Sequence, residues 1–266
     1  MSNTKSAKSA GGSFCGFSMA ALYKKCAVLP CEGRSIALDT SAIIVCAGNA
    51  TRMQGVNKIL LPLGDTNVIG MSMRAFEACP SVAEIILVCR DCDRQEIEQT
   101  AERLGIQKLT AITIGGHTRQ ESVQNGLRKL SRSTEYVAIH DGARPLVKPE
   151  QIERTIHDAR VFGGATLGAP VKDTIKAVSD GLITDTPPRH TLYLTQTPQV
   201  FRRRLYFEGV DFALEHGLDF TDDCQLVEAI GGKVYMTVGD YTNIKITTPE
   251  DAAIAQAILK QQEEQA

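Results

Sequence analysis

A loop of small residues followed by two cations is the stretch of this sequence best suited to chemistry. The small residues are Ala47, Gly48 and Asn49, and they follow an apolar run that is typical of a buried strand. Small side chains let a ligand approach the backbone, whose N–H groups can then bind phosphate oxygens. Arg52 and Lys58 add fixed positive charge. The stretch is therefore predicted to hold a polyphosphate.

Two common nucleotide-binding motifs do not describe this loop. It is neither the GxGxxG turn of dinucleotide-binding folds nor the GxxxxGK[ST] sequence of a P-loop. An Ala-Gly pair after a strand is most often an ordinary turn between a strand and a helix. The other polar clusters of the chain must therefore support the polyphosphate interpretation.

Two such clusters also follow predicted strands. The first, residues 115–122, begins with Gly-Gly and could seat a planar base edge, although an ordinary glycine-rich turn explains it nearly as well. The second, residues 140–145, contains Asp141, a carboxylate that could bind ribose hydroxyls or approach Mg²⁺. A structural pair between Asp141 and Arg144 is an equally good explanation of that cluster.

Other polar residues are less specific when taken singly. Arg189 reads as a solvated charge, Thr221 as part of a helix cap and Lys245 as a lysine at a strand end. Cys89 and Cys92 form a CxxC pair, but no second pair follows at zinc spacing. Buried or incidental thiols are the simpler interpretation, so no side-chain metal site is predicted.

The elements that position these residues alternate between strand and helix. Predicted strands cover residues 42–46, 84–89, 109–114 and 136–140, and predicted helices cover residues 67–78, 93–104, 119–130 and 149–162. Repeated strand–helix units with short connections favour an α/β fold, Rossmann-like, with an open, mostly parallel sheet and helices on both faces. Ligands of such sheets bind at the carboxyl ends of strands, where the polar clusters lie.

The second half of the chain interrupts this alternation. Residues 168–191 predict a β-hairpin that projects from the sheet as an arm, suited to dimerisation, although a plain surface hairpin is the alternative. The later elements are predicted as strands 191–201, 233–238 and 243–246 and helices 202–216, 223–230 and 249–265.

Size and composition limit the function classes. The 266 residues suffice for one large domain, predicted over residues 41–266, preceded by a flexible extension over residues 1–40. The net charge of −2 does not indicate the excess of positive charge that non-specific nucleic-acid binding requires. No apolar run is long enough for a membrane span. Eight scattered cysteines suit a reducing, cytoplasmic location.

Seven sequence blocks carry a family resemblance that spans residue 41 to the last helix. They are AGNATRM with Lys58, GGHTRQESV, IHDGARPLV, APVKDTIKAV, PPRHTLYLTQTPQVF, FTDDCQLVE and GDYTNIKITTPED. In this order they resemble the 2-C-methyl-D-erythritol 4-phosphate cytidylyltransferase family, within the nucleotidyltransferase superfamily. The related ribitol-5-phosphate cytidylyltransferases share several blocks and are the alternative. A non-catalytic nucleotide-binding protein and a UTP- or GTP-dependent pyrophosphorylase fit less of the chain.

The resemblance implies a site for CTP and a polyol phosphate. It also implies Mg²⁺, carried mainly by the CTP phosphates, with Asp141 as a candidate ligand and no direct side-chain ligation assured. The implied catalytic residues are Arg52, Lys58 and Lys245. The implied nucleotide-binding residues are Ala47, Gly48, Asn49, Gly116, His117, Ser122, Asp141, Gly142 and Ala143. The implied acceptor-binding residues are Thr174, Arg189, Thr197, Thr221 and Lys245. Thr174 and Arg189 lie on the arm, which in the family reaches into the neighbouring subunit of a homodimer.

The chain departs from the family pattern at four positions in these blocks. They are Ala50, Thr51, Asn57 and His117, where other members often carry Gly, Arg, Pro and an acidic residue. None of these departures removes an implied catalytic cation. They concern the conformation of the first loop and the contact with the base.

Overall fold

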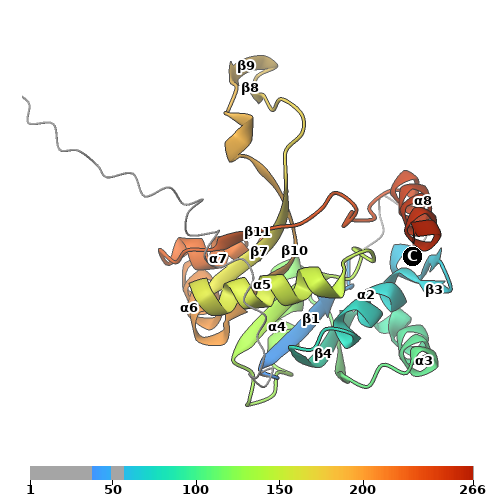
Figure 1. Cartoon of the computed structure of the whole chain (residues 1–266). Coiled ribbons are helices and arrows are strands. Elements are labelled where there is room, and N and C mark those ends of the chain that lie inside the picture. Colours follow the sequence, from blue (N-terminus) through green and yellow to red (C-terminus); the bar gives the residue numbers. More distant parts are fainter. Residues whose placement is uncertain (1–37, 49–56, 266) are drawn as a thin grey trace, which may run out of the picture. The chain divides into compact units, whose positions relative to one another are not determined.

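The computed structural model of the chain describes residues 38–48 and 57–265 (Figure 1). By internal contacts the chain divides into Met1–Ile36 and Ala37–Ala266, and the described residues all belong to the second unit. Most of the predicted extension, together with Asn49 and Arg52, lies outside the described residues.

Seven strands form one sheet in the order β11-β7-β10-β6-β1-β4-β5. Neighbouring strands run parallel except where β10 pairs with β6 and β7, which confirms the mostly parallel, open sheet. The strands are β1 (Thr40–Val45), β4 (Val82–Cys89), β5 (Leu109–Ile114), β6 (Tyr136–Asp141), β7 (Gly164–Pro170), β10 (Tyr193–Arg202) and β11 (Tyr235–Val238).

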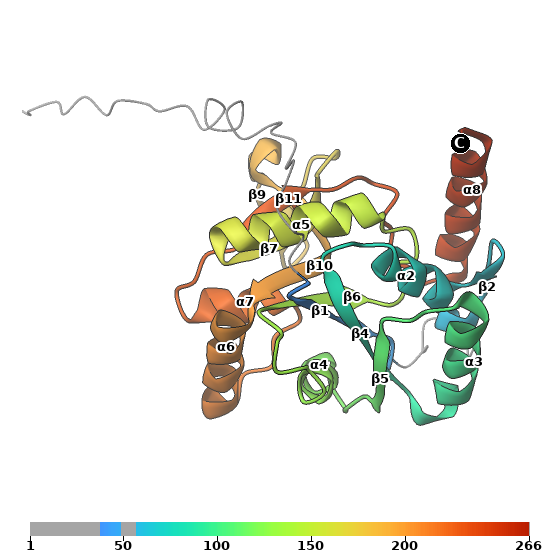
Figure 2. The ribbon, with the colours of Figure 1, turned by 60° about the horizontal axis from the view of Figure 1, so that its bottom comes forward.

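Helices cover both faces of the sheet, as predicted (Figure 2). Successive residues of β1 point to opposite faces, so Ile44 packs in the cluster with α2, α3 and α5, and Ile43 packs in the cluster with α4, α6 and α7. The helices are α2 (Val68–Glu77), α3 (Arg94–Leu104), α4 (Arg119–Leu127), α5 (Pro149–Phe162), α6 (Arg203–His216), α7 (Asp223–Ala229) and α8 (Pro249–Gln265). Burial on both faces explains why the central strands are almost wholly apolar.

Short elements complete the connections near the first helix. They are η2 (Lys58–Leu60), β2 (Pro62–Leu63), β3 (Thr66–Asn67) and η3 (Asp91–Asp93). Asn67 caps α2 by accepting a hydrogen bond from the N–H of Gly70 at 2.9 Å. Gly105 ends α3 in the left-handed conformation with φ 64°, which is the usual role of glycine at this position.

The predicted hairpin is present, and its strands are short. Strands β8 (Ala177–Ser179) and β9 (Leu182–Asp185) pair antiparallel, and every residue of both is exposed. The turn between them places Asp180 and Gly181 at positive φ, the backbone that a two-residue hairpin turn requires. Figure 1 shows this hairpin standing away from the seven-stranded sheet. A short η4 (Arg189–Thr191) leads back into β10.

Two predicted elements differ from the structure by more than two residues. The strand predicted over residues 243–246 is wrong. This segment is a loop that individual hydrogen bonds hold in place, without the hydrogen-bond ladder of a β-sheet. The side-chain amide of Asn243 donates to the carbonyl of Thr197 at 3.0 Å, and the N–H of Ile246 donates to the carbonyl of Ala143 at 2.8 Å. Helix α4 ends at Leu127 rather than at Leu130, because the chain tightens into three-residue turns there.

Candidate functional site

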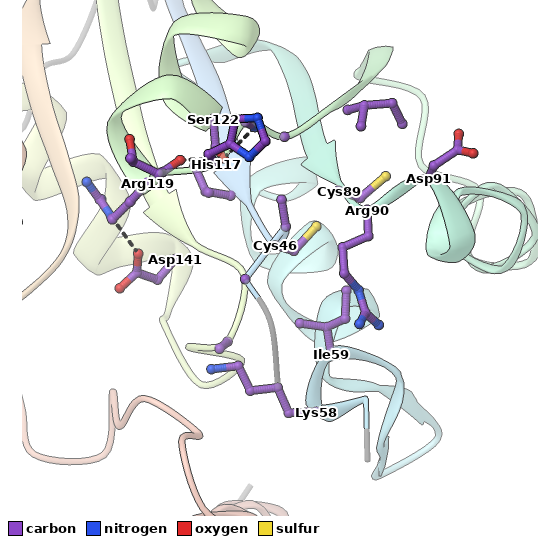
Figure 3. Close-up of a pocket in the computed structure, with 18 of the residues that line it drawn as sticks. Cys46, Lys58, Ile59, Cys89, Arg90, Asp91, His117, Arg119, Ser122 and Asp141 are labelled. Carbon is purple, nitrogen blue, oxygen red and sulfur yellow. Dashed lines mark hydrogen bonds and ion pairs between the residues drawn. The ribbon is translucent and has the colours of Figure 1, made fainter. Parts of the chain in front are cut away.

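A cavity of about 520 Å³ lies at the carboxyl ends of β1, β4, β5 and β6 (Figure 3). Its lining includes most of the nucleotide-binding residues expected from the sequence. These are Ala47, Gly48, Gly116, His117, Ser122, Asp141 and Ala143, together with Lys58 and Lys245. Residues from five separate segments therefore meet at one edge of the sheet, where an α/β sheet binds its ligands.

A second cavity of about 170 Å³ adjoins the first, and the two share Arg119, Asp141 and Lys245. Two of the expected acceptor-binding residues, Thr197 and Thr221, line this smaller cavity. Two ligands placed in the two cavities would meet beside the three shared charged residues. This arrangement suits the transfer of a group from one ligand to the other.

Asp141 is a carboxylate with three cations around it, and two of them, Lys245 and Arg119, line both cavities. The ammonium of Lys245 lies 2.7 Å from its Oδ2, Nε of Arg119 lies 3.4 Å from its Oδ1, and Nε of Arg144 lies 3.8 Å from its Oδ2. Burial favours the neutral acid, but the nearby cations outweigh it and hold the pKa of Asp141 well below its usual range. Asp141 is therefore ionised at neutral pH, and it orients the cations that border both cavities.

Arg119 links two buried carboxylates, and the sequence analysis assigned it no role. Its Nη1 lies 2.7 Å from Oδ2 of Asp223, whose Oδ1 accepts a hydrogen bond of 2.6 Å from the hydroxyl of Tyr206. Burial by itself lowers the pKa of Arg119, because it disfavours the charged form. The nearby carboxylates of Asp223 and Asp141 outweigh this effect and raise the pKa above its usual range. The sequence does contain one indication of a role for Arg119: it follows a glycine pair in the loop at the carboxyl end of a predicted strand.

The loop after β5 is shaped by glycines and by its own side chains. A Cβ on Gly115 would overlap the Cβ of Ala47, and a Cβ on Gly116 would overlap Glu121. The N–H of Gly116 donates to the hydroxyl of Ser122 at 3.0 Å, and that hydroxyl donates to a backbone carbonyl of the same loop. Ser122 is thus a buried support of the loop. His117 is exposed at its tip.

Thr197 belongs to a buried hydrogen-bonded chain with His140. Its hydroxyl accepts from the N–H of Asp141 at 3.0 Å and donates to Nδ1 of His140 at 3.0 Å. Nε2 of His140 then donates to the carbonyl of Arg144 at 3.2 Å. Burial lowers the pKa of His140 to about 4, so the imidazole is neutral at physiological pH. The chain of bonds fixes the backbone that carries Asp141.

Several expected site residues lie elsewhere. Gly142 does not line the cavities, because its N–H donates to the carbonyl of Val45 and its Cα faces the core. Thr174 and Arg189 are exposed on the arm and line neither cavity, and Arg189 donates to the carbonyl of Lys172 at 2.8 Å. Asn49 and Arg52 lie outside the described residues.

The cap of α7 is Asp222, whose carboxylate accepts from the N–H of Cys224 at 2.8 Å. Thr221 is therefore left exposed beside the smaller cavity, with its hydroxyl 3.4 Å from the side-chain oxygen of Gln225. Thr221 therefore lines the smaller cavity without capping the helix, contrary to its predicted part in the cap.

Within residues 38–48 and 57–265, no cluster of three or more His, Cys, Asp or Glu side chains could hold a metal ion. The carboxylates that border the two cavities are those of Asp91, Asp141 and Asp222. Across the same ranges, no helix combines the length and apolar character needed to cross a membrane.

Comparisons with known proteins agree on one family. Residues 40–261 match the family model described as 2-C-methyl-D-erythritol 4-phosphate cytidylyltransferase. The protein of that name from Caldanaerobacter subterraneus subsp. tengcongensis is 43% identical over 226 residues, which is 84% of this chain and 100% of that protein. Its namesake from Geobacillus kaustophilus is 42% identical over 223 residues, covering 84% and 97% of the two chains.

Solved structures give the same result. The 4-diphosphocytidyl-2C-methyl-D-erythritol synthase of Anaerococcus prevotii superposes with a TM-score of 0.75 and 32% identity, covering 83% of this chain and 96% of that chain. The 2-C-methyl-D-erythritol 4-phosphate cytidylyltransferase of Thermus thermophilus superposes with a TM-score of 0.67 and 31% identity, covering 83% and 98%.

Proposed function

The chain belongs to the 2-C-methyl-D-erythritol 4-phosphate cytidylyltransferase family, and from this premise we propose how its two cavities carry out the family's reaction. The enzyme transfers the cytidylyl group of CTP to 2-C-methyl-D-erythritol 4-phosphate. The products are 4-diphosphocytidyl-2-C-methyl-D-erythritol, a precursor in non-mevalonate isoprenoid synthesis, and pyrophosphate. The observation that supports this assignment is the sharing of Lys245, Asp141 and Arg119 by the two adjoining cavities.

The larger cavity takes CTP, and the smaller one takes the acceptor. Lys58 and the exposed Gly48 line the larger cavity, where they suit the triphosphate. The close-packed glycine loop at residues 115–116 also lines it, and we assign the base of CTP to this part of the cavity. Thr197 and Thr221 both line the smaller cavity, and the exposed hydroxyl of Thr221 suits a polyol phosphate, whereas that of Thr197 is held by His140 and Asp141.

The reaction is an in-line displacement at the α-phosphorus of CTP. A phosphate oxygen of the acceptor forms the new P–O bond while the bond to pyrophosphate breaks. The acceptor oxygen is already anionic, so the step needs no general base. The barrier comes from bringing anions together, and Lys58, Lys245 and Arg52 lower it by neutralising charge that develops on the phosphates.

Magnesium fits this site as an ion carried mainly by the substrate. Mg²⁺ in nucleotide sites is commonly bound by one or two carboxylates together with phosphate oxygens. Asp141 supplies an ionised carboxylate at the junction of the cavities, although Lys245 and Arg119 already compensate its charge. When bound, the ion would neutralise phosphate charge. Chelation with EDTA is expected to abolish turnover and to leave the thermal unfolding temperature of the apo-protein unchanged.

The arm supports a homodimer. Val178, Leu182 and Ile183 are 58%, 74% and 63% exposed, and they lie together on the paired strands β8 and β9. A second copy of the chain would cover them, and it would bring Thr174 and Arg189 to the acceptor phosphate of the neighbouring subunit. The described cysteines are all free thiols, which supports a reducing, cytoplasmic location.

Pyrophosphate release tests the proposal directly. We expect release with CTP, Mg²⁺ and 2-C-methyl-D-erythritol 4-phosphate, and none when UTP replaces CTP. Release only with ribitol 5-phosphate would retain the mechanism but change the acceptor. If the folded protein released no pyrophosphate with either acceptor, the result would favour a nucleotide-binding protein without catalytic activity.

A further inference from the structure

The residue that precedes Lys58 is fastened to a buried carboxylate on a different strand–helix connection. The side-chain amide of Asn57 donates a hydrogen bond of 2.7 Å to Oδ1 of Asp93. Asp93 is only 3% exposed and ends η3, the short turn between β4 and α3. A hydrogen bond between an amide and a buried carboxylate is among the stronger protein hydrogen bonds.

Asp93 is itself held firmly in place. Nε of Arg90 donates to its Oδ2 at 2.7 Å, and Nη2 of Arg90 donates to its Oδ1 at 2.9 Å. This two-bond pairing compensates the buried charge and fixes the plane of the carboxylate. Arg90 also borders the larger cavity. The carboxylate is therefore a rigid anchor directly behind the cavity wall.

The bond from Asn57 acts at the start of the turn that carries Lys58. The carbonyl of Asn57 accepts from the N–H of Leu60 at 3.1 Å and closes η2, whose first residue is Lys58. Ile59, the next residue, is buried in the core. Figure 3 shows Lys58, Ile59 and Arg90 on the same side of the cavity. A three-residue 3₁₀ turn has weak hydrogen bonds of its own, so the anchor supplies the restraint.

We propose that Asn57 and Asp93 are positioning residues for Lys58. They hold the start of η2 against the loop after β4, so that the long, flexible lysine side chain leaves the backbone in the direction of the cavity. This inference rests on the proposed role of Lys58 at the CTP phosphates. A displacement of about 1 Å at such a group costs roughly 10²-fold in rate, so a restraint of this kind affects turnover.

Turnover of Asn57→Ala, Lys58→Ala and the double variant tests the inference. We expect Asn57→Ala to lower kcat about tenfold while KM for CTP changes by less than about threefold, because the lost interaction acts in the transition state. In the Lys58→Ala background, Asn57→Ala should lower kcat no further, because its effect passes through the missing lysine. Losses that multiply in the double variant would overturn the inference.

An isosteric variant and a matched control complete the test. Asn57→Asp keeps the side-chain shape but sets a carboxylate against Asp93, so its kcat should fall at least as far as that of Asn57→Ala. Wild-type kcat in Asn57→Asp would overturn the inference. Glu98→Gln removes the exposed partner of Arg94 on the same helix and should leave kcat unchanged.

The same measurements separate this inference from the proposed function. Wild-type kcat in Lys58→Ala would contradict the role of Lys58 itself. Impaired Lys58→Ala beside wild-type Asn57→Ala would contradict only the positioning role.

Discussion

The ammonium of Lys245 lies 2.7 Å from Oδ2 of Asp141, and this pair stands where the two adjoining cavities of the candidate site join. Asp141 ends the central strand β6, whereas Lys245 comes from an irregular loop before α8. The loop is fixed by Arg144, whose Nη1 donates to the carbonyl of Asn243 at 2.9 Å. A flexible lysine is thus held at one point between two cavities.

Lys245→Ala should lower kcat by about 10²–10³-fold, which is the usual effect of removing one electrostatic stabiliser of a transition state. The measurement is steady-state pyrophosphate release with saturating CTP and acceptor. Lys260→Ala is the matched control, because Lys260 forms an exposed pair with Glu264 on α8. Near-wild-type turnover in Lys245→Ala would contradict the mechanism.

His140 should make the apo-protein less stable in mild acid. Its pKa is lowered from 6.5 to about 4 by burial, so between these values the unfolded state binds the proton and the folded state does not. Its full contribution is therefore present above about pH 6.5 and is lost as the pH falls toward 4. Asp141, Arg144 and Lys245 are the charged groups that face the imidazole.

Urea unfolding at pH 7.5 and pH 5 measures this effect. The loss attributable to His140 at pH 5 is roughly 2 kcal/mol, from a rate of about 1.4 kcal/mol per pH unit. His140→Asn, whose side-chain oxygen can accept the hydrogen bond from Thr197, should lose correspondingly less stability between the two pH values. An identical pH dependence in both proteins would refute this assignment.

Asp223→Asn should destabilise the fold by about 3 kcal/mol, because it removes a buried partner of Arg119 and leaves the guanidinium incompletely compensated. Glu208→Gln breaks an exposed pair with Arg204 and should cost less than about 0.5 kcal/mol. The comparison is made by urea unfolding at pH 7.5. Equal effects of the two changes would show that Arg119 is compensated by Asp141 alone.

Two glycine substitutions should distinguish a glycine that is needed for packing from one that is needed for the approach of CTP to the backbone. Gly115→Ala should lower the stability by about 1–3 kcal/mol, because its Cβ would overlap Ala47. A Cβ on Gly48 meets no atom within 4 Å, so Gly48→Ala should leave the unfolding temperature unchanged and raise KM for CTP. An unchanged KM would remove Gly48 from the proposed CTP site.

Leu182→Asp should convert the proposed homodimer into a monomer, because it places a charge among the exposed apolar side chains of the arm. Leu214, 58% exposed on α6, provides the matched control as Leu214→Asp. Sedimentation equilibrium reports the mass of each. A wild-type monomer, or a dimer that survives Leu182→Asp, would contradict dimerisation through this surface.

Local sequence patterns were sufficient to predict most elements of the fold. The bounds of β5, α5 and α8 agree with the structure, because apolar periodicity and the prolines that open α5 and α8 act over a few neighbouring residues. The alternation of strands and helices also predicted the mostly parallel sheet and the edge at which Ala47, Gly116 and Asp141 meet.

Only the tertiary structure decided the partners of the polar side chains. Arg119 has no local signal for its pairs with Asp141 and Asp223, and Asn57 has none for its bond to Asp93. The segment at residues 243–246 resembles a strand locally, yet it folds as a loop that is hydrogen-bonded to β10 and to the turn after β6. Backbone conformation follows from near neighbours, whereas the compensation of a buried charge depends on residues that only folding brings together.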